Sequence, residues 1–109
     1  IDAGMNDFMR PALYDAVHKI IPIKKSKSKL KGTIEFVGPI CESTCKFGSY
    51  KNYQKMSEND FVAITNVGAY GSSLSSNYNS RPLIAELLVN KNKIKYIRKK
   101  QDLLKLINS

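Results

Sequence analysis

Residues 33–39 read Thr-Ile-Glu-Phe-Val-Gly-Pro, and this stretch indicates the fold most directly. Its first five residues are mostly β-branched or aromatic, which is typical of a strand, and the Gly-Pro pair ends that strand. Comparable apolar runs predict four more strands, at residues 20–23, 61–65, 83–89 and 93–97. Pro22 places the first of these at a sheet edge. The last two are joined by a tight hairpin turn at residues 90–92.

The remaining segments predict short helices and loops. We expect a short helix within residues 6–18, capped by Asn6, and a second one at residues 101–107. Residues 41–59 lack a clean period and are expected to form a long loop, while residues 24–29 form a charged linker. The prediction is therefore a mainly β fold, a sandwich or small barrel with short helices, built as one domain over residues 1–109.

The charge balance suggests a nucleic-acid partner at first sight. The chain has 18 basic against 9 acidic residues, a formal net charge of +9. However, only three of the basic residues are arginines, the side chain best suited to recognising bases and phosphates. We therefore interpret the lysines as a solvated surface and do not expect nucleic-acid binding. No apolar run is long enough for a membrane helix and no signal peptide is evident, so a cytoplasmic protein is expected.

Two pairs of residues and one single residue are candidates for a catalytic or binding role. Cys41 and Glu42 follow the Gly-Pro that ends a strand, where a thiol can donate a proton and a carboxylate can hold an ammonium group. Tyr70 lies between glycines, which let a ligand approach closely. Arg10 and Tyr14 share one face of a helix and suit a carboxylate ligand.

Each candidate also has a purely structural interpretation. Cys41 and Glu42 fit an ordinary solvated loop, and Tyr70 fits a half-buried core position. Arg10 and Tyr14 fit an exposed arginine beside a packed tyrosine. His18 has no metal-ligand partner at suitable spacing and is expected to be structural. Two cysteines, Cys41 and Cys45, are too few for a disulfide framework or a metal site, so both are expected to be thiols.

Four blocks of sequence, taken in order, resemble the diaminopimelate decarboxylase family. They are Asp2-Ala3-Gly4-Met5-Asn6-Asp7, Arg10-Pro11-Ala12-Leu13-Tyr14, Val37-Gly38-Pro39-Ile40-Cys41-Glu42-Ser43, and Gly68-Ala69-Tyr70-Gly71 followed by Ser75-Ser76-Asn77-Tyr78-Asn79-Ser80-Arg81-Pro82. The resemblance covers residues 1 to about 86. It departs from the family pattern after Ser43, where Thr44-Cys45-Lys46-Phe47 replaces a residue followed by an aspartate.

The resemblance implies an alanine-racemase-like enzyme in which a β-domain follows a (β/α)8 barrel. It implies pyridoxal 5'-phosphate as cofactor and conversion of meso-diaminopimelate to L-lysine. By the family pattern, Arg10 and Tyr14 bind the distal carboxylate of the substrate and Glu42 its distal amino group. Cys41 donates the proton, and Tyr70 contacts cofactor and substrate. Cys41 and Glu42 reach into the partner's site, which implies a homodimer with shared active sites.

The family's cofactor-binding lysine and phosphate cradle lie in the barrel, and no lysine here occupies a matching motif. We therefore expect that this chain is part of a longer protein, and that alone it neither forms an imine with the cofactor nor decarboxylates a substrate. Two other hypotheses remain. One is a free-standing basic β-module that binds an acidic partner, and the other is a relative acting on ornithine or arginine.

Overall fold

The computed structural model describes residues 1–108, apart from the side chain of Ala69. Its strands are β1 (Ile20–Pro22), β2 (Thr33–Val37), β3 (Lys46–Lys51), β4 (Val62–Ile64), β5 (Glu86–Asn90) and β6 (Lys93–Arg98). Its helical elements are α1 (Arg10–Tyr14), α2 (Gly68–Ser73), the 3-10 turn η1 (Tyr78–Ser80) and α3 (Leu103–Ile107). The prediction of a mainly β fold with short helices is confirmed.

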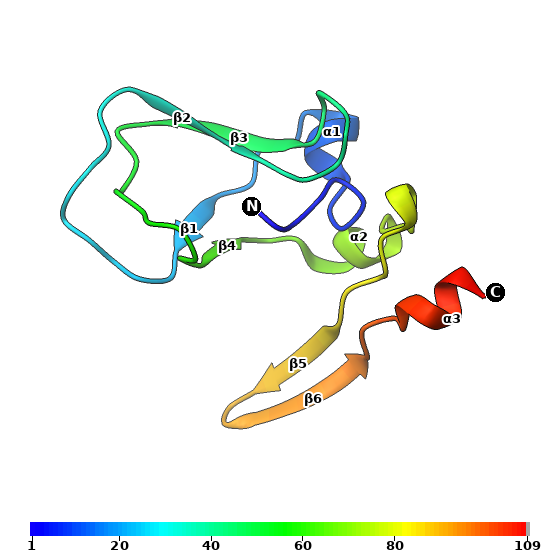
Figure 1. Cartoon of the computed structure of the whole chain (residues 1–109). Helices are drawn as coiled ribbons and strands as arrows, with labels where there is room; N and C mark the ends of the chain where they lie inside the picture. Colours follow the sequence, from blue (N-terminus) through cyan, green and yellow to red (C-terminus); the bar gives the residue numbers. More distant parts are fainter. Residues whose placement is uncertain (109) are drawn as a thin grey trace.

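The strands pair as three antiparallel two-stranded ladders, β1 with β4, β2 with β3, and β5 with β6. Figure 1 shows the β2–β3 ladder lying over the β1–β4 ladder, with the N-terminal segment between them. The described residues therefore form two layers around a core and do not close a barrel.

Aromatic side chains fill the space between the two layers. Phe8, from the N-terminal segment, packs with Ile20 of β1, Phe36 of β2 and Phe47 of β3 in one buried cluster. Because each of these side chains comes from a different segment, the cluster fixes the N-terminal segment against both ladders. Burying such side chains provides about 1.5–3 kcal/mol each.

Two tyrosine hydroxyls tie the layers together at the edge of this core. The Tyr50 hydroxyl donates to the carbonyl of His18 at 3.2 Å and accepts from the amide of Ile20 at 3.0 Å. The Tyr53 hydroxyl donates to the carbonyl of Ile20 at 2.7 Å. Burial is the main cause that raises the pKa of Tyr53, and the charge of Tyr50 adds to it. Both hydroxyls thus satisfy backbone groups at the start of β1.

A second cluster lies beside the segment that follows β2. Met5, Ile40 and Cys45 are buried together, and the Cys45 thiol accepts a hydrogen bond from the Met5 amide at 3.3 Å. Cys45 belongs to the stretch that departs from the family pattern. Its burial shows how that stretch is accommodated, since Cys45 holds the loop after Ser43 against the N-terminal segment.

Strand β3 corrects the prediction of one long loop over residues 41–59. Phe36 pairs with Gly48 whereas Val37 pairs with Lys46, so Phe47 is the extra residue of a β-bulge. The bulge allows both Phe47 and Tyr50 to face the core although they are three residues apart. This spacing breaks the alternation by which a strand is recognised in a sequence.

One further expectation about a helix was wrong in detail. Asn6 does not cap a helix: α1 starts at Arg10 after an N-cap at Met9, and Asn6 is fully buried. The glycine-rich stretch at residues 68–71 begins α2. In contrast, α3 follows the prediction and is capped by Asp102, whose carboxylate accepts from the Leu104 amide at 2.9 Å.

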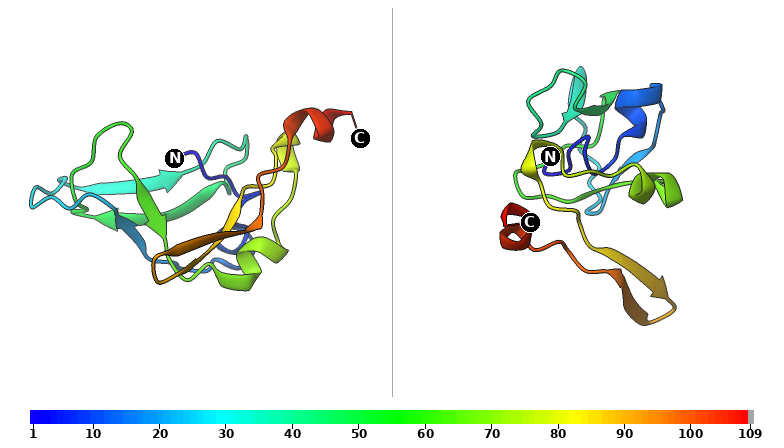
Figure 2. Two further views of the ribbon diagram at one scale, coloured as in Figure 1. Left: turned by 90° about the horizontal axis from the view of Figure 1, so that it is seen from below. Right: turned by 90° about the vertical axis from the view of Figure 1, so that its right-hand side faces the viewer.

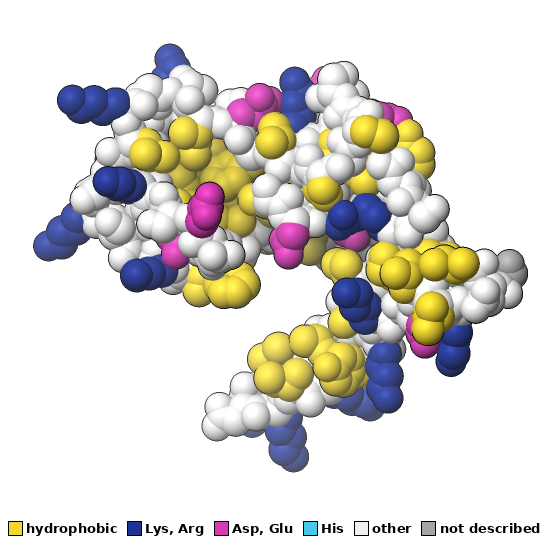
Figure 3. All heavy atoms as spheres, viewed as in Figure 1, with side chains coloured by type: hydrophobic (Ala, Val, Ile, Leu, Met, Phe, Trp, Pro, Cys, Tyr) yellow, Lys and Arg dark blue, Asp and Glu magenta, His cyan; other side chains and the backbone are white. Residues whose placement is uncertain are grey.

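The hairpin of β5 and β6 extends away from the two layers, as Figure 1 and the right-hand view of Figure 2 show. Figure 3 shows apolar side chains gathered on this hairpin and on α3. The exposed apolar residues of these elements are Leu87, Leu88, Val89, Ile94, Tyr96, Ile97, Leu103, Leu104 and Ile107. We call residues 86–98 the hairpin arm.

Candidate functional site

Helix α1 holds the first pair of candidate residues. Arg10 begins the helix and Tyr14 ends it, with Pro11 in its first turn and Asp15 closing it in the left-handed conformation at φ 52°. Residues four apart on a helix lie on one face. The Tyr14 side chain is exposed rather than packed. The pair is therefore placed to meet a ligand from outside the described residues.

Tyr70 lies close to this pair although it belongs to α2. The Arg10 guanidinium carbon is 5.6 Å from the centre of the Tyr70 ring, within the range of a cation–π interaction. Tyr70 is 65% exposed, so the alternative of a half-buried core tyrosine is wrong. We call Arg10, Tyr14 and Tyr70 the arginine group.

Cys41 and Glu42 follow β2 and are both exposed. The Glu42 carboxylate accepts a hydrogen bond from the Tyr78 hydroxyl, and at its other oxygen from the Thr44 hydroxyl at 3.4 Å. The Cys41 sulfur accepts from the Asn79 amide nitrogen at 3.4 Å. Tyr78 and Asn79 come from η1, so two adjacent residues of one segment meet two adjacent residues of another. We call these four residues the cysteine group.

The hydrogen bond from Tyr78 to Glu42 also changes the acidity of the phenol. It is the largest cause that raises the pKa of Tyr78, and desolvation and the negative charge of Glu42 act in the same direction. Tyr78 consequently stays protonated, and remains a hydrogen-bond donor to Glu42, up to a higher pH than an isolated tyrosine.

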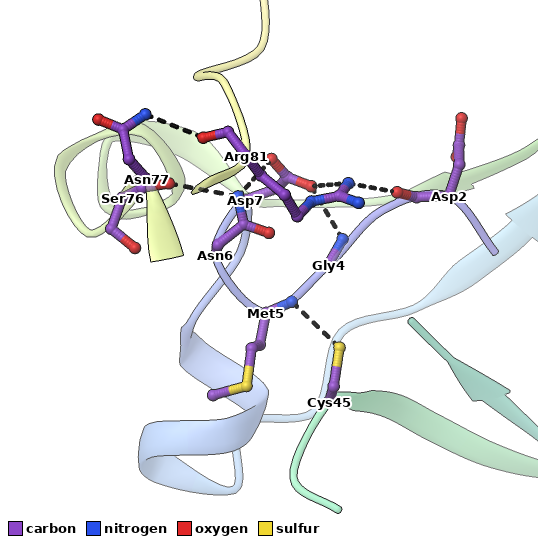
Figure 4. Close-up of polar contacts among 9 residues, drawn as sticks. All are labelled: Asp2, Gly4, Met5, Asn6, Asp7, Cys45, Ser76, Asn77 and Arg81. Carbon is purple, nitrogen blue, oxygen red and sulfur yellow. Dashed lines mark hydrogen bonds and ion pairs between the residues drawn. The ribbon is translucent and has the colours of Figure 1, made fainter. Parts of the chain in front are cut away.

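The segment that presents Tyr78 and Asn79 is anchored to the N-terminal segment, as Figure 4 shows. The Asn6 amide donates to the carbonyl of Ser76 at 3.2 Å, and the Ser76 amide donates back to the carbonyl of Asn6 at 2.9 Å. Arg81 donates to the carbonyl of Asp2 at 2.8 Å and pairs with the Asp7 carboxylate at 3.4 Å. These contacts hold the segment on either side of η1.

Sequence reasoning found Cys41 and Glu42 but assigned no role to Tyr78 and Asn79. The signal was present, because both lie in the run Asn77-Tyr78-Asn79-Ser80 that contributes to the family resemblance. The pairing itself depends on a contact between residues 36 to 38 positions apart, which no local pattern reveals.

The two groups remain separate in this chain. Among residues 1–108, no hydrogen bond, ion pair or ring contact joins the arginine group to the cysteine group. The described residues thus present two separate clusters of candidate side chains.

His18 lies outside both groups, as its structural interpretation predicts. It is buried, its Nδ1 lies 3.0 Å from the carbonyl oxygen of Thr65, and its ring packs edge-on against Phe8. Within the described part of the chain, no cluster of three or more histidine, cysteine or acidic residues is arranged to hold a metal ion. None of the described helices is long and apolar enough to cross a membrane.

Comparison with known proteins identifies related sequences and structures. Residues 1–68 match the family described as pyridoxal-dependent decarboxylase, C-terminal sheet domain. A diaminopimelate decarboxylase of Helicobacter pylori is 47% identical over 103 residues, covering 94% of this chain and 25% of that protein. One from Aquifex aeolicus is 40% identical over 102 residues, covering 94% of this chain and 24% of that protein.

Solved structures of diaminopimelate decarboxylases are also similar to this chain. Diaminopimelate decarboxylase from M. jannaschii matches with a TM-score of 0.89 and 40% identity, covering 100% of this chain and 25% of that one. The Helicobacter pylori enzyme complexed with L-lysine matches with a TM-score of 0.85 and 45% identity, covering 98% of this chain and 26% of that one.

The chain thus spans about a quarter of the length of the relatives that it matches. The similarity extends over almost all of its residues, including β5, β6 and α3, which lie beyond the family match. The chain therefore belongs to the pyridoxal-dependent decarboxylase family, in which it corresponds to the C-terminal sheet domain.

Proposed function

We propose that this chain serves an enzyme that decarboxylates meso-2,6-diaminopimelate to L-lysine with pyridoxal 5'-phosphate. The main support is its 45% identity to part of a diaminopimelate decarboxylase whose structure holds L-lysine. The exposure of Cys41, Glu42, Tyr14 and Tyr70 also supports it, because residues that meet a substrate must be accessible.

The arginine group suits the distal carboxylate of the substrate. A guanidinium forms two parallel hydrogen bonds to a carboxylate, and the Tyr14 hydroxyl supplies a further donor from the same helix. Glu42 suits the distal ammonium group, because the Tyr78 and Thr44 hydroxyls hold its carboxylate in place. In this proposal the positive charge of Arg10 thus recognises the distal carboxylate, and the negative charge of Glu42 recognises the distal ammonium group.

Tyr70 fits a contact with the cofactor. The centre of its exposed ring lies 5.6 Å from the Arg10 guanidinium carbon, and its hydroxyl can donate to an anionic phosphate. Neither side chain is an amine, so these residues fit a contact with the cofactor rather than its covalent attachment. Pyridoxal phosphate, when bound, supplies the electron sink for breaking the carbon–carboxylate bond.

Cys41 is the proposed proton donor. The substrate loses its carboxylate as carbon dioxide, and the electron pair left at that carbon takes the proton of the Cys41 thiol. Cys41 then regains a proton from solvent, which its exposure permits. The net change replaces one carboxylate by one hydrogen.

The assembly in this proposal is a cytoplasmic homodimer with shared active sites, in which residues 1–109 form one domain. The separation of the two groups supports sharing, because neither group is a complete site by itself. The lysines at positions 19–31 and 91–105 are exposed. They are proposed to be solvated and not to bind nucleic acid.

The test uses the full natural gene product that contains this sequence. With pyridoxal phosphate and meso-diaminopimelate it is expected to release carbon dioxide and L-lysine in equal amounts. Ornithine and arginine serve as alternative substrates, and faster turnover of either one contradicts the proposed specificity. Cys41→Ala is expected to lower kcat at least 100-fold, whereas the neighbouring Ser43→Ala, a matched exposed control, is not. Residues 1–109 alone are expected to form no imine with the cofactor.

A further inference from the structure

Two consecutive residues of η1 contact two consecutive residues of the segment that follows β2. Tyr78 meets Glu42 and the next residue, Asn79, meets Cys41, the residue before Glu42. We propose that Tyr78 and Asn79 are positioning residues that hold Glu42 and Cys41 in their working orientations. This inference rests on the proposed function, since it concerns residues assigned to substrate binding and proton delivery.

Asn79 can bind Cys41 in both of its protonation states. Its amide nitrogen lies 3.4 Å from the Cys41 sulfur and can donate to a thiolate. Its amide oxygen lies 3.9 Å from the same sulfur and can accept from a thiol. A proton donor must pass between these two forms in every turnover. One amide with a donor and an acceptor therefore keeps the sulfur in place before and after the proton leaves.

The backbone at this turn favours asparagine. Asn79 adopts φ 61° and ψ 27°, the left-handed region that most side chains avoid and that asparagine tolerates. Ser80 follows with φ 56°. Two consecutive residues in this region make a tight turn, and this turn directs the Asn79 side chain toward Cys41.

Contacts on both sides of the turn fix its orientation. Ser76 is bound to Asn6 through two hydrogen bonds, and Arg81 is bound to Asp2 and Asp7. Across the turn, the Asn77 amide donates to the carbonyl of Arg81 at 2.9 Å. Positioning residues need this kind of support, because a mobile partner cannot fix the group that it contacts.

Tyr78 acts on Glu42 in a similar way. Its hydroxyl binds one carboxylate oxygen while Thr44 binds the other, so rotation of the carboxylate is restricted. Glu42 is exposed, and without these donors its side chain would sample several rotamers. Holding it in one rotamer favours binding of an ammonium group at a defined distance.

The first experiment compares Asn79→Gly with Asn66→Gly in the full gene product. Both asparagines have positive φ, 61° and 57°, so glycine is tolerated by the backbone at each position. Of the two, only Asn79 contacts Cys41. We expect Asn79→Gly to lower kcat about tenfold, since it removes a hydrogen bond to the proton donor, and Asn66→Gly to leave kcat within twofold.

The second experiment measures Cys41 without any turnover. The folded protein is alkylated with iodoacetamide at pH 7 and then digested with a protease that cleaves after glutamate. Cleavage after Glu42 places Cys41 and Cys45 on different peptides, so the alkylation rate of Cys41 is measured separately. Asn79→Asp tolerates the same backbone but places a carboxylate beside the sulfur, which disfavours the reactive thiolate. We expect alkylation to be about tenfold slower in Asn79→Asp than in the wild type, and unchanged in Asn66→Gly.

The third experiment separates the role of Tyr78. Tyr78→Phe is expected to raise KM for diaminopimelate about tenfold with kcat within threefold, because it loosens the carboxylate that binds substrate. Tyr96→Phe, at an exposed tyrosine of the hairpin arm, is the matched control and is expected to change neither.

The outcomes distinguish this inference from the proposed function. If the wild type releases no carbon dioxide from any substrate tested, the proposed function is wrong, while the alkylation rates still decide whether Asn79 controls Cys41. If the wild type is active but Asn79→Gly matches Asn66→Gly and Asn79→Asp leaves Cys41 alkylation unchanged, the role of Asn79 is overturned. An unchanged KM in Tyr78→Phe overturns the role of Tyr78.

Discussion

The guanidinium of Arg81 lies 3.4 Å from the carboxylate of Asp7, joining residues 74 positions apart. The Asp7 side chain is only 7% exposed, and its carboxylate also accepts from the Gly4 amide at 2.8 Å. This ion pair connects the N-terminal segment to the segment that carries Tyr78 and Asn79. Its loss is expected to affect both stability and the candidate site.

Arg81→Met should lower the free energy of unfolding by about 2–4 kcal/mol, because it leaves a buried carboxylate without its cation. Lys46→Met is the matched control. Lys46 pairs with Glu35 at 3.7 Å, but both side chains are about half exposed, so its removal should cost less than about 1 kcal/mol. Urea unfolding of the two variants measures both values. Equal losses of unfolding free energy in the two variants would show that burial of Asp7 does not determine the strength of its ion pair with Arg81.

Gly38→Ala is expected to destabilise the protein by at least about 2 kcal/mol. A methyl group there would clash with the carbonyl of Ala3 and would lie 2.7 Å from the Cys45 sulfur. Gly71→Ala is the control, because its methyl group would meet Val67 and Phe8 at 3.5 Å or more. Thermal unfolding compares the two, and a Tm for Gly38→Ala equal to that of Gly71→Ala would contradict the close approach.

Tyr53 should make stability fall at alkaline pH. Its pKa in the folded protein is raised above the usual value near 10, mainly by burial. The unfolded chain therefore loses this proton first. The free energy of unfolding should be constant with respect to Tyr53 below about pH 10 and fall as the pH rises toward the folded pKa.

Tyr53→Phe removes this dependence. It also removes the hydrogen bond to Ile20, so it should be less stable by about 1 kcal/mol at pH 7. Urea unfolding between neutral and alkaline pH, with Tyr96→Phe as an exposed control, tests the sign. A steeper alkaline loss in Tyr53→Phe than in the wild type would contradict this account.

Subunit mixing tests the shared site. Arg10→Ala and Cys41→Ala are each expected to be nearly inactive in the full gene product. If each site combines Arg10 of one subunit with Cys41 of the other, half of the randomly mixed dimers contain one intact site. Mixing should then restore about a quarter of wild-type activity. Absence of recovery after verified subunit exchange would place both residues in one subunit's site.

Local sequence patterns predicted the elements whose partners are near in the chain. The hairpin arm was predicted because two apolar runs flank a short polar turn, and β2 because Gly38-Pro39 ends it. Strand β3 was missed because the bulge at Phe47 breaks the alternation of buried side chains. Asn6 was assigned a capping role from its position, whereas it binds Ser76, 70 residues away.

The candidate site was likewise predicted only in part from the sequence. Arg10, Tyr14, Cys41, Glu42 and Tyr70 were selected from the chemistry of their side chains and from the family resemblance. Their grouping was not predicted, because Arg10 meets Tyr70, and Cys41 meets Asn79, only through the folded backbone. Residue type thus suggested the candidates, and tertiary contacts determined which of them lie together.

The hairpin arm is the part of the chain where local unfolding should begin. Its base is tied to the rest of the chain through Ser72, whose hydroxyl accepts from Arg98 at 3.5 Å and donates to Glu86 at 3.1 Å. Just beyond the arm, Gln101 accepts from the Asn77 side-chain amide at 2.6 Å. Its tip projects into solvent, and an isolated two-stranded hairpin is only marginally stable. Backbone amides of Leu88 and Ile94 should therefore exchange with deuterium well before those of Phe36, so the hairpin arm opens while the cysteine group stays assembled.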